Sequence, residues 1–196
     1  MNASPPIAAS PLPKLSKSLV LIGMPGAGKS SVGKKLAKRL GVPFADSDAK
    51  IEEAAGMRVE EIFARLGEPA FREGERRVIA RLLEGPPCVL STGGGAFMDE
   101  TTRALIREKG ISVWLRADFD ILLERVMRNT NRPLLQKKDP AAALRELQDK
   151  REPVYATADV EAVSNERPAE ETVERVLRAL AAYLSLPERS PQSPSS

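Results

Sequence analysis

The chain has 196 residues, of which 42% are hydrophobic, and its 30 Lys and Arg against 27 Asp and Glu give a formal net charge of +3. This composition suffices for one domain with a buried core, and the small basic excess predicts no nucleic-acid partner. The chain has no His and one Cys, Cys88. The lack of His excludes catalytic triads and metal sites that depend on histidine. The single Cys excludes cysteine zinc clusters and an internal disulfide. Asp, Glu, Lys, Arg, Ser, Thr and the backbone are left to carry the chemistry.

Both ends of the chain are rich in Pro and Ser, a composition that favours neither helix nor strand. We therefore expect disordered tails at 1–16 and 187–196 around a folded body at 17–186. No apolar run reaches the roughly 18 to 20 residues of a membrane span. The first residues also lack the charged start and apolar segment of a secretory signal. We expect a cytoplasmic protein with no membrane partner.

Short apolar runs alternate with longer segments of helical periodicity along the body. The runs predict strands at 18–22, 43–46, 88–90, 111–115 and 159–163. The periodic segments predict helices at 29–40, 48–55, 59–66, 69–84, 99–109, 118–128, 140–157 and 169–185. This alternation indicates an α/β fold, a mostly parallel sheet covered by helices on both faces. Ligands in such folds bind at the carboxyl ends of the strands.

The segment 23–30, GMPGAGKS, matches the Walker A pattern between a predicted strand and a predicted helix. Its glycines let successive backbone N–H groups face a phosphate at the start of the helix. Lys29 would reach the β- and γ-phosphates, and the Ser30 hydroxyl would ligate Mg²⁺. A glycine-rich turn with a surface lysine is the alternative. Because pattern and context agree, the segment predicts binding of a nucleoside triphosphate.

Two carboxylates, Asp46 and Asp48, stand where the strand 43–46 ends. If the strand persists, their side chains leave the same face of the sheet. One carboxylate could hold Mg²⁺ through water while the other accepts a hydroxyl proton. The alternative is structural, with Asp48 as the N-cap of a helix that begins at Ala49. No Walker B aspartate follows the strand 88–90, so Asp46 is the available carboxylate for a metal.

The segment 91–95, STGGG, follows the strand 88–90 directly. Three consecutive glycines let the backbone approach a small ligand closely and adopt positive φ. A merely flexible turn is the alternative.

Arginines recur at positions where positive charge would serve a kinase. Arg72 has Glu75 three residues on, a spacing that can orient its guanidinium. Arg132 lies in a polar segment that reads as a lid or a surface loop, and Arg151 lies in a later helix. Each alone is more simply a surface charge. Together they could neutralise a γ-phosphate and grip a carboxylated acceptor.

The chain carries six motifs in succession: the Walker A loop, DSD, FRxxE, TGGG, NxxRPLL and RxPxY. In this order and approximate spacing, they resemble the shikimate kinase family, and the resemblance covers about 18–184. The resemblance implies the three-layer α/β/α P-loop kinase fold, like that of the nucleoside monophosphate kinases. Its five-stranded parallel sheet would have the order 2-3-1-4-5, with a mobile lid at about 128–139. The implied reaction transfers phosphate from ATP to the 3-hydroxyl of shikimate with Mg²⁺, giving shikimate 3-phosphate and ADP in aromatic amino acid biosynthesis. We expect a monomer.

The resemblance also implies roles for single residues. Asp48 would contact the shikimate hydroxyls and help to deprotonate the attacking one, with Lys29 and Arg132 acting on the phosphates. Shikimate would be held by Asp48, Arg72, Gly93, Gly94, Gly95 and Arg151. ATP would be bound by Gly26, Ala27, Gly28, Lys29, Ser30, Ser31, Arg125, Arg132 and Pro168. Ser30 and Asp46 would hold the metal.

Two alternatives remain open. The first is another small-molecule kinase of this superfamily, such as a gluconate kinase, against which the DSD strand end and the glycine loop both argue. The second is a nucleotide-binding module without activity. The presence of a suitable residue at every expected catalytic position argues against it.

Overall fold

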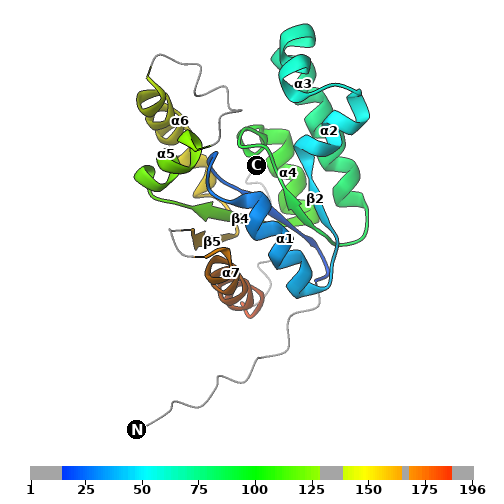
Figure 1. Ribbon diagram of the computed structural model, residues 1–196. Helices are drawn as coiled ribbons and strands as arrows, with labels where there is room; N and C mark the ends of the chain where they lie inside the picture. The colour runs from blue at the N-terminus through cyan, green and yellow to red at the C-terminus, as the bar shows by residue number, and fades with distance from the viewer. Residues whose placement is uncertain (1–14, 129–138, 165–167, 187–196) are drawn as a thin grey trace, which may run out of the picture.

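The computed structural model describes residues 15–128, 139–164 and 168–186, which form a parallel sheet between two layers of helices (Figure 1). The strands pair in the order β2-β3-β1-β4-β5, so the predicted order is confirmed. Their bounds lie within one residue of those predicted. They are β1 (Ser18–Ile22), β2 (Phe44–Asp46), β3 (Val89–Ser91), β4 (Gly110–Arg116) and β5 (Val160–Val163).

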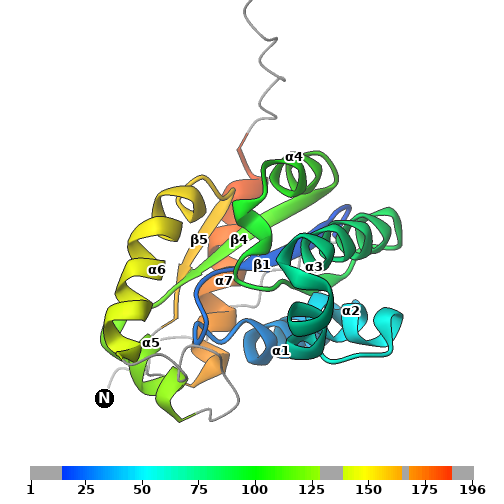
Figure 2. The same ribbon diagram turned by 90° about the horizontal axis from the view of Figure 1, so that it is seen from above.

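Helices connect successive strands and cover both faces of the sheet. They are α1 (Lys29–Leu40), α2 (Ser47–Ala55), α3 (Val59–Glu84), the short η1 (Ala96–Met98), α4 (Glu100–Lys109), α5 (Phe119–Met127), α6 (Pro140–Tyr155) and α7 (Ala169–Leu184). Helices α1 and α7 pack together on one side, and α3 packs with α4 on the other (Figure 2). No helix in the described parts of the chain combines the length and apolar character of a membrane span.

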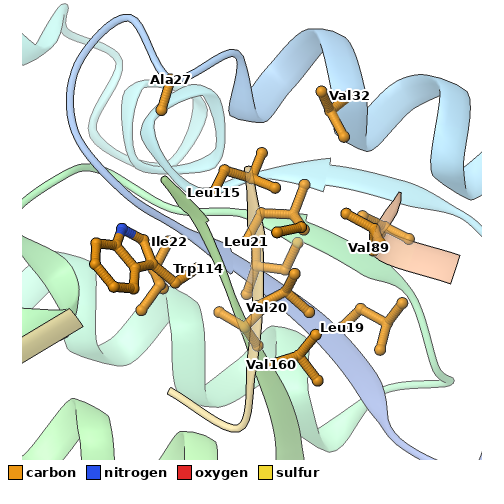
Figure 3. Packing of buried hydrophobic residues seen from close by; sticks show 14 of the residues in the cluster. Leu19, Val20, Leu21, Ile22, Ala27, Val32, Val89, Trp114, Leu115 and Val160 are labelled. Atoms are coloured by element: carbon orange, nitrogen blue, oxygen red, sulfur yellow. The ribbon is translucent and has the colours of Figure 1, made fainter. Parts of the chain in front are cut away.

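The core is centred on β1, which pairs with β3 on one side and β4 on the other. All five of its residues are buried, as expected for a central parallel strand covered on both faces. Figure 3 shows Leu21 and Leu115 beneath Val32 of α1, while Ile22 and Trp114 lie next to each other and away from that helix. This arrangement fixes the carboxyl end of β1, from which the glycine-rich loop 23–28 departs.

Local sequence signals explain where most helices begin and end. Asp46, Asp99 and Asp139 each accept a hydrogen bond from a backbone N–H in the first turn of the following helix, which is the usual role of an N-cap. Gly41 and Gly56 end α1 and α2 in the left-handed conformation.

Helix α3 consists of two arms, as the two predicted helices 59–66 and 69–84 require. Gly67 between them is not helical, with φ 80° and ψ 169°, and Pro69 follows it. Helix α2 and the two arms of α3 share a small apolar cluster of Ile51, Ile62 and Phe71 that is separate from the main core. This part of the molecule therefore has packing of its own.

Several sequence-based expectations lie outside the described residues, including Arg132, most of the lid segment at 129–138, and the tails at 1–14 and 187–196. Leu15 falls within the predicted tail, yet it is half-buried against the main core. Close by, Lys17 Nζ donates a 2.7 Å hydrogen bond to the Glu108 carbonyl. The packed body thus extends at least to Leu15, two residues before the predicted boundary.

Candidate active site

A cavity of about 250 Å³ lies where the carboxyl ends of β1, β2 and β3 meet the start of α1. It is lined by Pro25, Gly26, Gly28, Lys29, Ser30, Ser31, Asp46, Asp48, Ser91, Thr92, Gly93 and Gly94. The structure thus brings the predicted Walker A residues, both aspartates and part of the glycine loop into one place.

The Walker A loop depends on its glycines. Gly23, Gly26 and Gly28 have φ values of 144°, 88° and 86°, a region that other residues rarely adopt. A Cβ at Gly23 would also lie 2.6 Å from the carbonyl oxygen of Leu115. Lys29 folds back over this loop, because its Nζ donates to the carbonyls of Gly23 (2.9 Å) and Met24 (3.1 Å). The result is an ammonium beside a helix N-terminus, an arrangement that favours a bound anion.

Each carboxylate oxygen of Asp46 accepts a hydrogen bond from a different element. Its Oδ2 accepts a 2.9 Å hydrogen bond from Ser30 Oγ, and its Oδ1 accepts a 3.1 Å bond from the Asp48 backbone N–H. Asp46 is therefore the N-cap of α2, and the alternative in which Asp48 caps the helix is wrong. The premise that the strand persists is also wrong, because β2 ends at Asp46 and α2 begins at Ser47. The cap, and not the strand pleat, places Asp48 beside the loop.

Ser91 occupies the strand-end position where a Walker B aspartate is absent. Its Oγ lies 3.3 Å from Ser30 Oγ, and its backbone pairs in register with Asp46 on the neighbouring strand. Two side-chain oxygens thus flank the Ser30 hydroxyl, one from β2 and one from β3.

Two carboxylates flank Gly93, that of the half-buried Asp48 and that of the buried Glu75. A Cβ at Gly93 would lie 2.9 Å from Asp48 Oδ1 and 2.9 Å from Glu75 Oε1. The two oxygens are therefore no more than twice that distance apart, and neither has a hydrogen-bond partner among the described residues. The site thus holds two unsatisfied acceptors that a ligand hydroxyl or a water can pair.

Both carboxylates are harder to ionise than in water. Burial raises the pKa of Asp48, and the Asp46 charge raises it further, whereas Lys29 opposes the shift. Burial likewise raises the pKa of Glu75, although its hydrogen bond from Arg72 acts in the opposite direction. That bond joins Arg72 Nη1 to Glu75 Oε2 at 2.6 Å.

Each glycine of the 93–95 loop makes room for a charged side chain. A Cβ at Gly94 would lie 2.7 Å from Arg151 Nη1, and one at Gly95 would lie 2.7 Å from Arg72 Cζ. None of the three glycines takes a positive φ. They are required by close approach and not by backbone conformation, so the expected need for positive φ is wrong here.

Arg72 and Arg151 line a second cavity of about 280 Å³ that adjoins the first through the glycine loop. The other lining residues are Glu68, Gly95, Met98, Asp99, Leu147 and Lys150. Burial alone would lower the pKa of Arg72, but its hydrogen bonds to Glu75 and Glu68 outweigh this effect and raise that pKa. The two guanidiniums reach the loop from α3 and α6.

Two other residues predicted to bind the nucleotide, Arg125 and Ala27, lie beside and within the Walker A loop. Arg125 Nη1 donates to the Gly26 carbonyl at 3.2 Å and lies 3.5 Å from Ser164 Oγ. Pro168 is exposed at the N-cap of α7. The buried Ala27 lies within the loop itself, where its N–H donates to the Met24 carbonyl.

Sequence reasoning assigned no role to Ser91, Ser164 or Tyr155. Ser91 could have been found as the residue in the Walker B position, and Tyr155 closes the RxPxY motif. Its hydroxyl donates a hydrogen bond to the Gly94 carbonyl. Nothing in the sequence singles out Ser164.

Comparison with known proteins agrees with this geometry. The family model described as shikimate kinase matches residues 25–181. A shikimate kinase from Caulobacter vibrioides is 56% identical over 168 residues, covering 86% of this chain and 84% of that protein. One from Bradyrhizobium diazoefficiens is 50% identical over 188 residues, covering 93% of this chain and 91% of that protein.

Solved structures give the same result. The structure of shikimate kinase from Acinetobacter baumannii in complex with shikimate matches with a TM-score of 0.82 and 35% identity, covering 86% of this chain and 95% of that one. A gluconokinase from Sinorhizobium meliloti matches with a TM-score of 0.59 at 22% identity, which reflects the shared fold alone. From its sequence, its fold and these relatives, the chain belongs to the shikimate kinase family.

Proposed function

We propose that the protein transfers the γ-phosphoryl group of ATP to the 3-hydroxyl of shikimate, giving shikimate 3-phosphate and ADP. One observation carries the assignment to this acceptor. Asp48, Arg72 and Arg151 come from three helices and converge on Gly93–Gly95 beside the Walker A loop. A carboxylate that can accept a hydroxyl proton and two guanidiniums that fit a carboxylate match a hydroxylated acid.

The nucleotide would occupy the Walker A side of the site. The loop N–H groups and the start of α1 would hold its phosphates, and Lys29 would exchange its loop carbonyls for β- and γ-phosphate oxygens. Ser31 lines the same cavity. Arg125 and Pro168 would flank the adenine. Arg132, outside the described residues, stays a prediction as a further phosphate ligand.

Magnesium fits the oxygens next to the loop. Ser30 Oγ and Asp46 Oδ2, 2.9 Å apart, are hard donors of the type that Mg²⁺ prefers alongside phosphate and water. We infer that these residues hold it, Asp46 through water. When bound, the ion would neutralise charge on the β- and γ-phosphates.

The acceptor hydroxyl would be activated by Asp48. Its raised pKa makes it a stronger base than an exposed aspartate, and the Lys29 charge helps to keep it ionised. Its unpartnered Oδ1 is free to accept a hydroxyl proton. Arg72 and Arg151 would bind the carboxylate of shikimate and thereby orient the ring, with Gly93–Gly95 beneath it.

Release of ADP with and without shikimate tests the proposal. We expect Mg²⁺-dependent ADP release that requires shikimate and yields shikimate 3-phosphate by mass spectrometry, with gluconate giving none. Equal ADP release with and without shikimate would refute it. Turnover of gluconate in place of shikimate would favour the other kinase class, and nucleotide binding without any turnover would favour an inactive module.

We further propose that the enzyme acts in the cytoplasm, where ATP is supplied, and as a monomer, because every assigned residue comes from one chain. Sedimentation at assay concentration tests the oligomeric state, and a dimer would refute it.

A further inference from the structure

Tyr155, the last residue of α6, is completely buried in the main core. Its ring centroid lies 6.5 Å from that of Phe97 and 6.2 Å from that of Trp114, with tilted planes. A phenylalanine would make the same ring contacts. The hydroxyl group therefore calls for a separate explanation.

That hydroxyl joins two parts of the acceptor site. It donates a hydrogen bond to the carbonyl oxygen of Gly94, 61 residues away in the sequence. Arg151, one helical turn earlier in α6, lies near enough to the same hydroxyl for its charge to act on the phenol pKa, and its Nη1 lies 2.7 Å from the point where a Gly94 Cβ would stand. Arg151 and Tyr155 thus meet at Gly94, where the phenol donates to the carbonyl and the guanidinium lies beside the same residue.

The hydroxyl is suited to this task. Burial raises the pKa of the Tyr155 phenol, although the Arg151 charge acts against the shift. The group therefore keeps its proton at neutral pH and remains a donor to Gly94. Without it, the Gly94 carbonyl would lose this hydrogen bond, and the guanidinium would lose a neighbour that fixes its direction.

We propose that Tyr155 is a positioning residue for the acceptor, which holds the Arg151 guanidinium against the Gly93–Gly95 loop in the orientation that receives the acceptor carboxylate. The proposal rests on the proposed function, in which Arg151 binds that carboxylate. It predicts an effect confined to the acceptor, because no described hydrogen bond links Tyr155 to the Walker A loop.

The chain offers a matched control, since it contains two tyrosines. Tyr183 lies in α7, and its hydroxyl is 3.4 Å from Asp159 Oδ1 at the opposite ends of the strands. Tyr155→Phe should raise KM for shikimate about tenfold, as expected for the net loss of one hydrogen bond. KM for ATP should change less than twofold. Tyr183→Phe should change neither constant.

A double-mutant cycle separates positioning from general loosening of the fold. Shikimate affinity is measured by calorimetry for wild type, Tyr155→Phe, Arg151→Lys and the double variant. If Tyr155 acts through Arg151, the tyrosine change should cost little more in the Arg151→Lys background. The proposal would be overturned if Tyr155→Phe weakened shikimate binding by the same factor in the Arg151→Lys background as in wild type. It would also be overturned if Tyr155→Phe left the KM for shikimate unchanged, or if it raised the KM values for shikimate and ATP equally.

A measurement on the unsubstituted chain covers the case in which Tyr155→Phe does not fold. Protein labelled with 3-fluorotyrosine gives two ¹⁹F resonances, which Tyr183→Phe assigns. Saturating shikimate should shift the Tyr155 resonance and leave that of Tyr183 in place. A Tyr155 resonance that does not move would overturn the proposal. Absence of shikimate-dependent turnover in the wild-type enzyme would instead refute the proposed function.

Discussion

The nucleotide side and the acceptor side of the site are built in different ways. The part of the nucleotide side that would bind the phosphates is one contiguous segment, 23–30, in which backbone N–H groups and Lys29 would be the main ligands. The acceptor side gathers side chains from α2, α3 and α6 around a glycine loop after β3. The nucleotide side therefore depends mainly on the conformation of the backbone, whereas the acceptor side depends on charged side chains that other side chains hold in place.

The difference appears in the electrostatics. Around the Walker A loop, Lys29 and Ser30 already have partners in the structure. On the acceptor side, Asp48 Oδ1 and Glu75 Oε1 are buried without a hydrogen-bond partner in the described parts of the chain, and both carboxyl groups have raised pKa values. Unpaired buried acceptors are costly to the fold. We therefore expect the acceptor side to be less stable when empty and to gain more from its ligand.

The largest expected effect concerns the nucleotide side. Lys29→Ala should lower turnover by about 10²–10³-fold, as removal of a group that stabilises transferring charge does elsewhere. Shikimate affinity, measured by calorimetry, should stay within a few-fold of wild type. Lys38→Ala, which removes an exposed lysine from the same helix, is the matched control. A comparable loss of shikimate affinity in Lys29→Ala would mean that the two sides do not separate.

Asp48→Asn should lower turnover by about 10²-fold or more, because a general base is lost, and it should also stabilise the protein. The pKa of Asp48 is raised in the fold, so ionisation disfavours the folded state as pH rises through that value. Asparagine removes this cost. The melting temperature of the variant should exceed that of wild type at pH 8, and the gap should close as pH falls below about 3.9, the ordinary Asp value.

The control for this change is Asp149→Asn, at an exposed position in α6. It should alter neither turnover nor melting temperature. If Asp48→Asn lowers the melting temperature at pH 8, the carboxylate stabilises the empty site and the electrostatic contrast between the two sides is wrong.

Arg72→Lys should weaken shikimate binding about tenfold and leave nucleotide binding unchanged. A guanidinium can bind a substrate carboxylate through two parallel N–H bonds while it keeps its bond to Glu75, whereas an ammonium lacks this planar fork. Paired titrations with shikimate and an ATP analogue measure the two affinities, with Arg77→Lys, an exposed arginine of the same helix, as control. A larger loss for the nucleotide would reverse the assignment.

The smallest expected effect is that of shortening the N-terminus. Removal of residues 1–14 should leave activity and melting temperature unchanged, because this segment lacks apolar periodicity. Removal of 1–17 also takes away the Leu15 packing and the bond from Lys17 to Glu108, and should lower the melting temperature by about 2–4 °C for each kcal/mol lost. Equal effects of the two deletions would place the boundary elsewhere.

Prediction from sequence succeeded where information is local. Strand bounds and sheet order follow from apolar runs and strand–helix alternation, and the two arms of α3 follow from Gly67 and Pro69. The Walker A loop is a single segment, so its pattern was sufficient. Asp48 was singled out correctly as a cavity residue, but for the wrong geometric reason, because a cap cannot be told from a persisting strand before the helix start is known.

The rest depends on tertiary contacts. The need for three consecutive glycines follows from tertiary contacts, because Glu75, Arg151 and Arg72 lie close to the points where Cβ atoms on the glycines would stand. The role of Tyr155 depends on its distant contact with Gly94, which no spacing in the sequence reveals.

The separate apolar cluster of Ile51, Ile62 and Phe71 has a consequence for the evolution of such kinases. The segment 47–66 supplies Ile51 and Ile62 to that cluster, and it meets the long arm of α3 both at the non-helical Gly67 and through Phe71. We expect that it can be exchanged between homologues as a cassette when Phe71 is kept, because its apolar cluster is separate from the main core. The cassette contains Asp48 but not Arg72 or Arg151. A chimera would therefore inherit its choice of hydroxyl from one parent and its choice of acid from the other.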